Sequence, residues 1–314
     1  MDTTWLLDLQ ILAKTLNFSR AAELRNITQP AFGRRVRSLE AWCGATLVDR
    51  SSHRLALTEA GKVMVDAADD VLLRLERAKH ELQQVRSATA TLTVASTHAL
   101  SYTFFPGWIQ RLGAVASTTP VRLLSDNMNE CERLMHEGEA QFLLCHHHPG
   151  TPTRLAEREF AKVVLAHELL VPVSRCEPEG RAVHRLPGSA LHPVPWLMFE
   201  ETSGLGRILA SSLSRRSKGL HLRNVFSSHL AMVLKALALE GKGVAWIPEG
   251  LAADELSAGG GLAVAGSMEW AVPVQVALFR ALRPLPDMAE RFWQLAVDQS
   301  LGQVSQVAGP VPAP

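Results

Sequence analysis

The stretch from residue 18 to residue 40, FSRAAELRNITQPAFGRRVRSLE, constrains the fold of this chain of 314 residues more than any other segment. It predicts two short helices joined by a tight polar turn. Thr28 is a suitable N-cap for the second helix, and Pro30 lies in the first turn, where a missing N–H costs little. Two helices this close together, one of them rich in arginine, call for a functional explanation.

The second helix is expected to bury one face and to expose cations on the other. Its apolar stripe has helical spacing and consists of Phe32, Val36 and Leu39. At about 100° per residue, Arg34 and Arg37 point away from this stripe and Arg35 lies on its flank. The arrangement is typical of a helix-turn-helix, whose arginines reach phosphates and guanine edges while Gln29 at the helix start reaches a base. A solvated basic face on an ordinary helix pair is the alternative.

The segments on either side complete a small DNA-binding head. Residues 6–16 predict a first helix, and TLVDR and RLALT predict two short strands around the tip SSH. Such a hairpin is a wing, whose basic side chains touch backbone phosphates. Six arginines face only two acidic residues between positions 25 and 54, although the whole chain has a net charge of +1. We therefore expect a local DNA-binding surface formed by Ser19, Thr28, Gln29, Pro30, Arg34, Arg35, Arg37, Arg50 and Arg54.

Residues 59–90 predict a long linker helix and a hinge. Apolar residues recur at steps of three and four, as in a coiled coil: Ala60, Val63, Ala67, Val71, Leu75, Ala78, Leu82 and Val85. An exposed stripe of this length needs a partner, and self-pairing gives two recognition helices for two DNA half-sites. The expected domains are thus a winged helix-turn-helix over 1–58, the linker over 59–90, a larger domain over 91–302 and a disordered tail over 303–314.

The larger domain is expected to be an α/β unit of two lobes with a binding cleft between them. Strand-like and helix-like segments alternate from Leu92 onward, which predicts a parallel sheet. We expect lobe I to span about 91–163 and 268–302, and lobe II about 164–267. The fold class of the whole chain is therefore α/β, with a helical head.

Small polar residues cluster where predicted strands end and helices begin. The three places are Ser96-Thr97-His98 with Ser101, Thr202-Ser203-Gly204, and Ser227-Ser228-His229. Free N–H groups at helix starts bind anions, so a carboxylate or a similar small anion is the expected ligand, although each place alone is also explained as a simple helix cap. The candidate effector-binding residues are Ser96, Thr97, His98, Ser101, Asn129, His146, Thr202, Ser203 and Ser228.

The run HHH at 146–148 raises the question of a metal site. On a strand His146 and His148 share a face, but no further cluster with ligand spacing lies near in the sequence. A histidine that lines the cleft, or an exposed turn, fits better, so we predict no metal and no cofactor. The four cysteines form no CxxC pair, no signal peptide or membrane-spanning run occurs, and a cytoplasmic protein with reduced thiols is expected.

Beyond these patterns, the sequence resembles the LysR-type transcriptional regulators over essentially its whole length. The resemblance is carried by the head LNFSRAAELRNITQPAFGRRVRSLEAWCGATLVDR, by LALTEAG after the wing, and by ALEGKGVAWIP in the larger domain. It implies a winged helix-turn-helix, a dimerising linker helix and a periplasmic-binding-protein-like effector domain, often in a tetramer. It also implies effector contacts at Thr97, Ser101 and Thr202. Gly33 replaces a serine that is common in the family, and Val48 replaces a phenylalanine.

A narrower resemblance concerns SDNMNECERLMHEGEAQFLLCHHHP, which looks like the subgroup that includes a hypochlorite-responsive regulator. Oxidation of methionine makes an apolar side chain polar, so the candidates for an oxidative switch are Met128, Met135, Met198 and Met232. Filling gaps in the core is the alternative role for these residues. Enzyme signatures such as GxSxG, the phosphate loop and HExxH are absent from the sequence. We therefore expect a homodimeric or homotetrameric regulator that binds double-stranded DNA and a small effector, rather than an enzyme with an accessory DNA-binding head.

Overall fold

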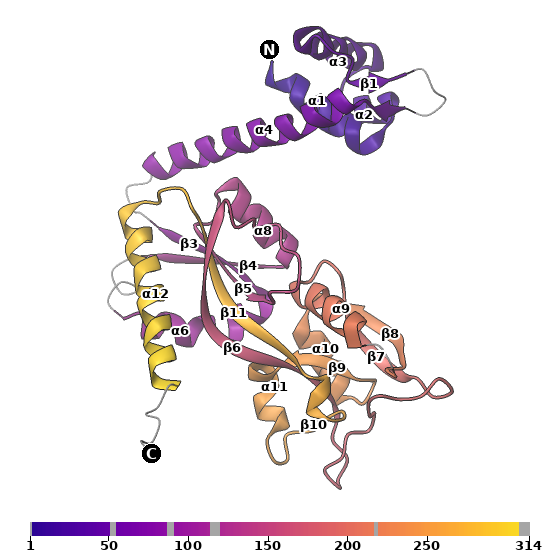
Figure 1. Cartoon of the computed structure of the whole chain (residues 1–314), viewed down its shortest axis with the longest axis vertical. Coiled ribbons are helices and arrows are strands. Elements are labelled where there is room, and N and C mark those ends of the chain that lie inside the picture. The colour runs from indigo at the N-terminus through magenta and orange to yellow at the C-terminus, as the bar shows by residue number, and fades with distance from the viewer. Residues whose placement is uncertain (1, 51–54, 87–90, 114–119, 217–218, 308–314) are drawn as a thin grey trace, which may run out of the picture. The chain divides into compact units, whose positions relative to one another are not determined.

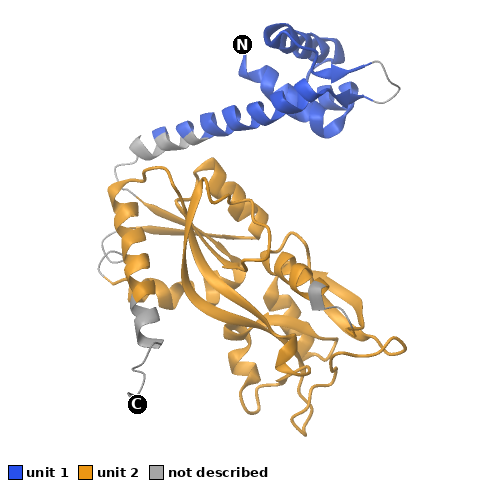
Figure 2. Cartoon of the chain, in the orientation of Figure 1, with its two compact units in different colours: residues 1–86 blue, residues 87–314 orange. Residues whose placement is uncertain are grey.

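The computed structural model describes residues 2–50, 55–86, 91–113, 120–216 and 219–307. The chain divides into two compact units, residues 1–86 and 87–314 (Figure 2). The first unit contains helices α1 (Thr3–Thr15), α2 (Phe18–Leu24), α3 (Gln29–Cys43) and α4 (Glu59–Arg86), and strands β1 (Val48–Asp49) and β2 (Ala56–Leu57).

Helices α1 and α3 supply most of the large buried side chains in the core of unit 1. Helix α1 contributes Leu6, Leu9 and Leu12, which are fully buried. Helix α3 contributes the predicted stripe, and Phe32, Val36 and Leu39 are fully buried as well. The first helix begins three residues earlier than the sequence pattern indicates, because the Asp2 side chain accepts a hydrogen bond from the backbone N–H of Thr4 and caps it there.

The wing and the turn follow the sequence closely. Strands β1 and β2 pair antiparallel, with Val48 opposite Leu57. Val48 is 1% exposed and packs in the core of unit 1. The tip of the hairpin, with His53 and Arg54, lies outside the described residues. Thr28 has the extended backbone of an N-cap, but its side chain makes no capping hydrogen bond.

Helix α4 packs one face on this core and leaves another face exposed. Ala68 is fully buried, and Met64, Val65 and Leu72 pack against the same core. The predicted stripe lies on a different face. Its large members are exposed: Val63 by 70%, Val71 by 42%, Leu75 by 49% and Leu82 by 66%.

The second unit is built on a seven-stranded sheet with β10, β6, β11, β5, β3 and β4 in that order, and with β9 also paired to β6. Strands β3, β4 and β5 are parallel, whereas β11 is antiparallel to both β5 and β6. A separate parallel pair joins β7 and β8. The strands are β3 (Leu92–Thr97), β4 (Val121–Asp126), β5 (Phe142–His147), β6 (Phe160–Arg175), β7 (Val194–Phe199), β8 (Leu222–Ser228), β9 (Ala245–Pro248), β10 (Leu262–Val264) and β11 (Val272–Ala281).

Helices cover the faces of these sheets (Figure 1). They are α5 (His98–Thr103), α6 (Phe105–Arg111), α8 (Met128–Glu137), α9 (Gly204–Arg216), α10 (Ala231–Leu239), α11 (Glu249–Leu256), the short 3-10 helix η1 (Met268–Trp270) and α12 (Asp287–Val307). Helix α12 thus continues into the segment that the sequence assigns to a tail, and residues 308–314 lie outside the described part of the chain.

Three hydrophobic cores define two lobes within unit 2. One core packs α6 and α12 on the sheet around Trp108, Phe142 and Phe292. A second packs α8 around Met135 and Leu143. The third lies around α9, α10 and the later half of β6. The long strand β6 and its antiparallel neighbour β11 therefore run from lobe I into lobe II (Figure 1).

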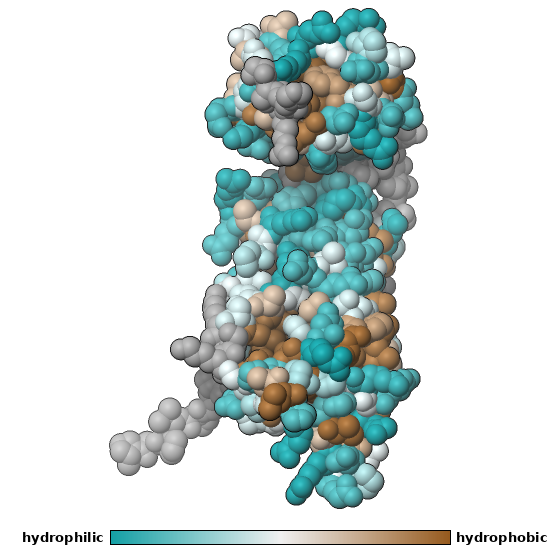
Figure 3. All heavy atoms as spheres, turned by 90° about the vertical axis from the view of Figure 1, so that its right-hand side faces the viewer, coloured by the Kyte–Doolittle hydropathy of each residue, from teal (hydrophilic) through white to brown (hydrophobic). Residues whose placement is uncertain are grey.

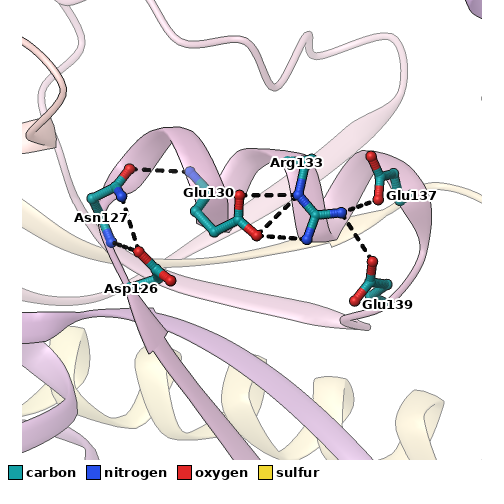
Figure 4. A network of polar contacts seen from close by, with 6 residues as sticks. All are labelled: Asp126, Asn127, Glu130, Arg133, Glu137 and Glu139. Atoms are coloured by element: carbon teal, nitrogen blue, oxygen red, sulfur yellow. Dashed lines mark hydrogen bonds and ion pairs between the residues drawn. The ribbon is translucent and has the colours of Figure 1, made fainter. Parts of the chain in front are cut away.

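An ion-pair network runs along helix α8 and joins its end to the segment that follows it (Figure 4). The guanidinium of Arg133 binds the carboxylates of Glu130, Glu137 and Glu139. At the other end of the helix, the side chain of Asn127 accepts a hydrogen bond from the backbone N–H of Glu130. The Asn127 cap thus starts α8 directly after the carboxyl end of β4.

Candidate DNA-binding surface and effector cleft

The exposed face of α3 carries the predicted DNA-binding side chains. Arg34 and Arg37 are exposed, and so are Thr28, Gln29 and Pro30 at the helix start. The Arg37 side chain donates a hydrogen bond to the carbonyl of Gly33 at 3.3 Å, which leaves the rest of its guanidinium in solvent. The stripe on the opposite side anchors the helix, so this face presents cations without using them for packing.

Arg35 differs from its neighbours because it is tied to the interior. Asp8 is fully buried on α1, and its carboxylate accepts from Arg25 at 2.6 Å and from Arg35 at 3.5 Å. A buried carboxylate needs such partners, since an unpaired one costs several kcal/mol. Arg35 therefore stabilises the head as well as lying on its basic face.

The remaining predicted DNA contacts lie at the edges of this surface. Ser19 is exposed on α2. Arg50 pairs with Glu40 at 3.0 Å and lies 5.4 Å from the ring centroid of Phe18. Glu40 also accepts from the backbone N–H groups of Leu47 and Val48, so it fixes the start of the wing.

The candidate effector cleft of unit 2 lies where several strands end. Thr97 ends β3 opposite Asp126, which ends β4, and His146 lies near the end of the parallel strand β5. Because carboxyl ends of parallel strands meet at one edge of a sheet, side chains that follow them converge. The other wall consists of the residues after β7 and β8. The lining residues are Thr97, His98, Ala99, Asp126, Asn127, Met128, His146, Ser203, Gly204, Leu205, His229 and Ala231.

Imidazoles dominate the polar side of this cleft. His98 and His229 face each other with ring centroids 5.8 Å apart. Burial lowers the pKa of His98, and the nearby His229 acts in the same direction, whereas Asp126 acts against both. Asp126 is itself engaged, since one carboxylate oxygen accepts from the backbone and the side-chain nitrogen of Asn127.

His146 is oriented by a carboxylate that spans the two lobes. Its Nε2 lies 2.8 Å from Glu168 on β6, and the other oxygen of Glu168 accepts from the backbone N–H of Gly250 in α11. Burial raises the pKa of Glu168, but the hydrogen bonds from His146 and Gly250 outweigh it and lower the pKa overall. The ring of His146 is thereby fixed at the cleft wall.

One polar atom in this cleft is unsatisfied. The hydroxyl oxygen of Thr97 is buried and has no hydrogen-bond partner among the residues that the structure describes. A buried hydroxyl without a partner costs about 1–3 kcal/mol. Thr97 therefore supplies an unused hydrogen-bonding group at the wall of the cleft.

The structure brings four of the nine predicted effector residues into the cleft lining: Thr97, His98, His146 and Ser203. The other five lie near it with their side chains engaged elsewhere or outside its wall. Ser96 is buried beneath it, Ser101 binds the hydroxyl of Ser125 at 2.8 Å, and Thr202 is exposed beside Glu200. Ser228 accepts from the backbone N–H of Leu230, and Asn129 lies on α8 outside the lining.

Sequence reasoning missed two polar or charged side chains of the wall, Asp126 and Asn127, and it named His229 within a polar cluster without selecting it as an effector-binding candidate. The sequence contains a signal for these residues. SDN at 125–127 and SSH at 227–229 each lie between a predicted strand and a predicted helix, as STH at 96–98 does. The structure also separates the three consecutive histidines. His146 faces the cleft, and His147 lies against Lys162. Within the described residues, no group of three His, Cys, Asp or Glu side chains is arranged to hold a metal ion.

Two cysteines lie beneath the cleft and are poorly suited to react. Burial raises the pKa of the Cys131 thiol to about 12, and burial raises the pKa of Cys145 still further. The thiolate is the reactive form, so both thiols are chemically quiet at neutral pH. Met128 is different, because its buried side chain lines the cleft and lies against Gly204 of the other lobe.

A winged helix-turn-helix with a cationic recognition helix, joined in one chain to a two-lobed domain with a polar cleft, defines the class of ligand-responsive DNA-binding regulators. No helix in the described ranges is both long and apolar enough to span a membrane.

Comparison with known proteins identifies the family. Residues 4–62 match the bacterial regulatory helix-turn-helix proteins of the lysR family, and residues 86–300 match the LysR substrate binding domain. The chain therefore belongs to the LysR family of transcriptional regulators, whose members are not enzymes.

Similar proteins from Escherichia coli are regulators too. The transcriptional regulator YjiE of Escherichia coli is 31% identical over 94% of this chain and 93% of its own length. The glycine cleavage system transcriptional activator of Escherichia coli is 30% identical over 79% of this chain and 77% of its own.

Two solved structures are similar over almost the whole chain. DarR from Vibrio fischeri, determined in complex with DNA, is 29% identical with a TM-score of 0.55, and it covers 95% of this chain and 99% of its own. The hypochlorite-specific regulator HypT from Salmonella typhimurium is 27% identical with a TM-score of 0.58, and it covers 96% of this chain and 99% of its own.

Proposed function

We propose that the cleft of unit 2 binds a small anionic effector and that this binding changes how the protein engages its operator. The observation that carries the proposal is the unpaired, buried hydroxyl of Thr97 within a wall of imidazoles. The lining holds three histidines and one carboxylate, Asp126, which already accepts two hydrogen bonds from Asn127. Two carboxylates outside the lining are also engaged, since Glu168 binds His146 and Glu200 lies 3.9 Å from His229. An anion placed in the cleft gains donors and meets little uncompensated negative charge.

The cleft is suited to transmit a signal because its wall comes from both lobes. Thr97 and His98 belong to lobe I, whereas Ser203 and His229 belong to lobe II. A ligand that touches both favours the arrangement in which both contacts are made. Different affinity for two arrangements is the thermodynamic requirement for regulation by an effector.

To find the effector, the melting temperature of the protein is measured in the presence of each member of a panel of small carboxylates, aromatic acids and amino acids. A specific ligand at a hundredfold over its Kd stabilises by about 2.7 kcal/mol. Operator affinity is then measured with and without the hit.

In Thr97→Val the effector response should be lost while operator binding without effector is kept. Thr103→Val removes a hydroxyl that donates to the carbonyl of Ala99, but Thr103 itself is not part of the cleft lining, so this variant should respond like the wild type. A full response in Thr97→Val would refute the assignment of the cleft.

We further propose that α3 reads the operator through Thr28, Gln29, Arg34 and Arg37, with Ser19, Pro30, Arg35, Arg50 and Arg54 around them. The exposed side chains on one helix face support this, as does the resemblance to DarR, which was solved with DNA. A DNA operator also implies a cytoplasmic site of action.

Pairing of two copies is part of the same proposal. Supporting observations are the exposed stripe on α4 and the exposed Val225 and Phe226 on β8, which pairs only with β7 among the described strands. Figure 3 shows apolar surface gathered on unit 2, in the lower half of the view. We propose a homodimer through α4, and a homotetramer if β8 forms a second contact.

Oxidation is the alternative signal, and Met128 is the observation that favours it. Met128 lines the cleft, whereas Met135 is in the core, Met198 is half-buried and Met232 is exposed outside the cleft. HypT, described as hypochlorite-specific, is among the similar structures. A sulfoxide at Met128 would be larger and polar against Gly204. Mild hypochlorite followed by mass spectrometry and operator binding tests this: a response that survives in Met128→Leu excludes Met128 as the switch.

A further inference from the structure

A second pocket lies in lobe I and shares no lining residue with the effector cleft. Its wall comes from β5, β6, β11 and the segment between β5 and β6. Its apolar side is formed by Leu155, Phe160 and Phe279, each at most 5% exposed. The volume of the pocket is about 1030 Å³ when the solvent at its mouth is counted. This volume is ample for a small organic molecule.

The polar side of this pocket is formed by the ammonium group of Lys162, which has no anionic partner among the described residues. The ammonium of Lys162 donates to Nε2 of His147 at 2.8 Å. Lys162 forms no ion pair with any residue that the structure describes. An ammonium has three N–H donors, so donors remain for a ligand after the bond to His147 is made.

The imidazole of His147 is neutral at pH 7, so Lys162 supplies the positive charge of this pair. Burial lowers the pKa of His147 to about 4, and the Lys162 ammonium acts in the same direction. Glu157 at the rim opposes these effects and is exposed to solvent, where its charge is screened. The ring of His147 lies edge-on to Phe279 with centroids 5.7 Å apart, which fixes its orientation.

Two further observations indicate a preformed binding site. The hydroxyl oxygen of Thr151 in the pocket wall is buried and lacks a partner within the described chain. The rim beside it is held in place, since the buried carboxylate of Glu132 accepts from Thr153 and from the backbone N–H of Arg154. A site that is already ordered binds without the cost of ordering it.

We propose that this pocket is a second small-molecule site, which takes a small aromatic carboxylate. The aromatic ring packs against Phe160 and Phe279, and the carboxylate pairs with Lys162. The pocket explains the middle member of the HHH run, which the effector cleft leaves unused. The site stands whether or not the cleft binds its proposed effector.

The test is 19F NMR titration of full-length protein with 4-fluorophenylacetate and with the matched cation 4-fluorophenethylamine. Wild type should bind the carboxylate more tightly than the amine. Lys162→Glu, at an exposed position, should reverse that preference and weaken the carboxylate by about fivefold or more. Lys162→Met should weaken the carboxylate and remove the preference. Lys242→Glu, a matched charge reversal at an exposed lysine of lobe II, should behave as wild type.

Three results would overturn the proposal. The first is absence of carboxylate binding to wild type. The second is equal carboxylate affinity in wild type and Lys162→Glu. The third is binding that survives in Lys162→Glu but disappears in Thr97→Val, which would locate the probe in the effector cleft. Circular dichroism of each variant establishes that the fold is intact.

Discussion

His147 shows how one residue's surroundings set a property of the whole protein. In the unfolded chain its imidazole titrates near pH 6.5, whereas burial and Lys162 lower its pKa to about 4 in the folded state. Between these values the unfolded chain binds a proton that the folded chain does not, so acid favours unfolding. We expect this stability to be complete above pH 6.5, to fall from pH 6.5 to 4, and to fall no further below it.

The variant His147→Gln removes this dependence. Its melting temperature should drop less than that of wild type between pH 7 and pH 4.5. The corresponding difference in the free energy of unfolding is on the order of 1 kcal/mol, because solvent reaches the pocket. His192→Gln, at an exposed position, is the control and should follow wild type. Parallel melting curves for wild type and His147→Gln over this range would show that His147 is not protonated on unfolding.

At the scale of elements, helix α3 separates its two tasks by face. Phe32, Val36 and Leu39 anchor it, and Arg34 on the other face makes no hydrogen bond or ion pair with any described residue. Arg34→Ala should therefore leave the melting temperature unchanged and cost roughly 1–3 kcal/mol of specific operator binding. Arg122→Ala, at an exposed arginine of β4, should change neither quantity. Fluorescence anisotropy with a labelled operator measures both variants, and unchanged affinity in Arg34→Ala would mean that another face of α3 meets the DNA.

The elements also show what a sequence contains and what it does not. Periodicity predicts the buried stripe of α3, the free stripe of α4 and the strand ends around the cleft, because each depends on spacing within one segment. Asp8 shows the limit: it interrupts an apolar run in the sequence, yet it is fully buried and pairs with Arg25 and Arg35. Contacts between distant segments, such as Lys162 with His147, depend on packing that no local pattern encodes.

At the scale of the whole molecule, the exposed stripe of α4 determines how copies assemble. Ala68 and its neighbours already pack on the head, so Val71, Leu75 and Leu82 belong to a separate face. Burying such side chains against a second copy gains about 1.5–3 kcal/mol each.

A charge in the middle of the stripe opposes that burial. Leu75→Glu should halve the molar mass seen by analytical ultracentrifugation at micromolar concentration and weaken operator binding, because one recognition helix then replaces two. Arg74→Glu places the same carboxylate one residue off the stripe, at an exposed position, and should keep the wild-type assembly although it changes the net charge by two units rather than one. If Leu75→Glu and Arg74→Glu sediment alike at the wild-type mass, α4 is not where the copies meet, and the open edge of β8 becomes the next interface to test.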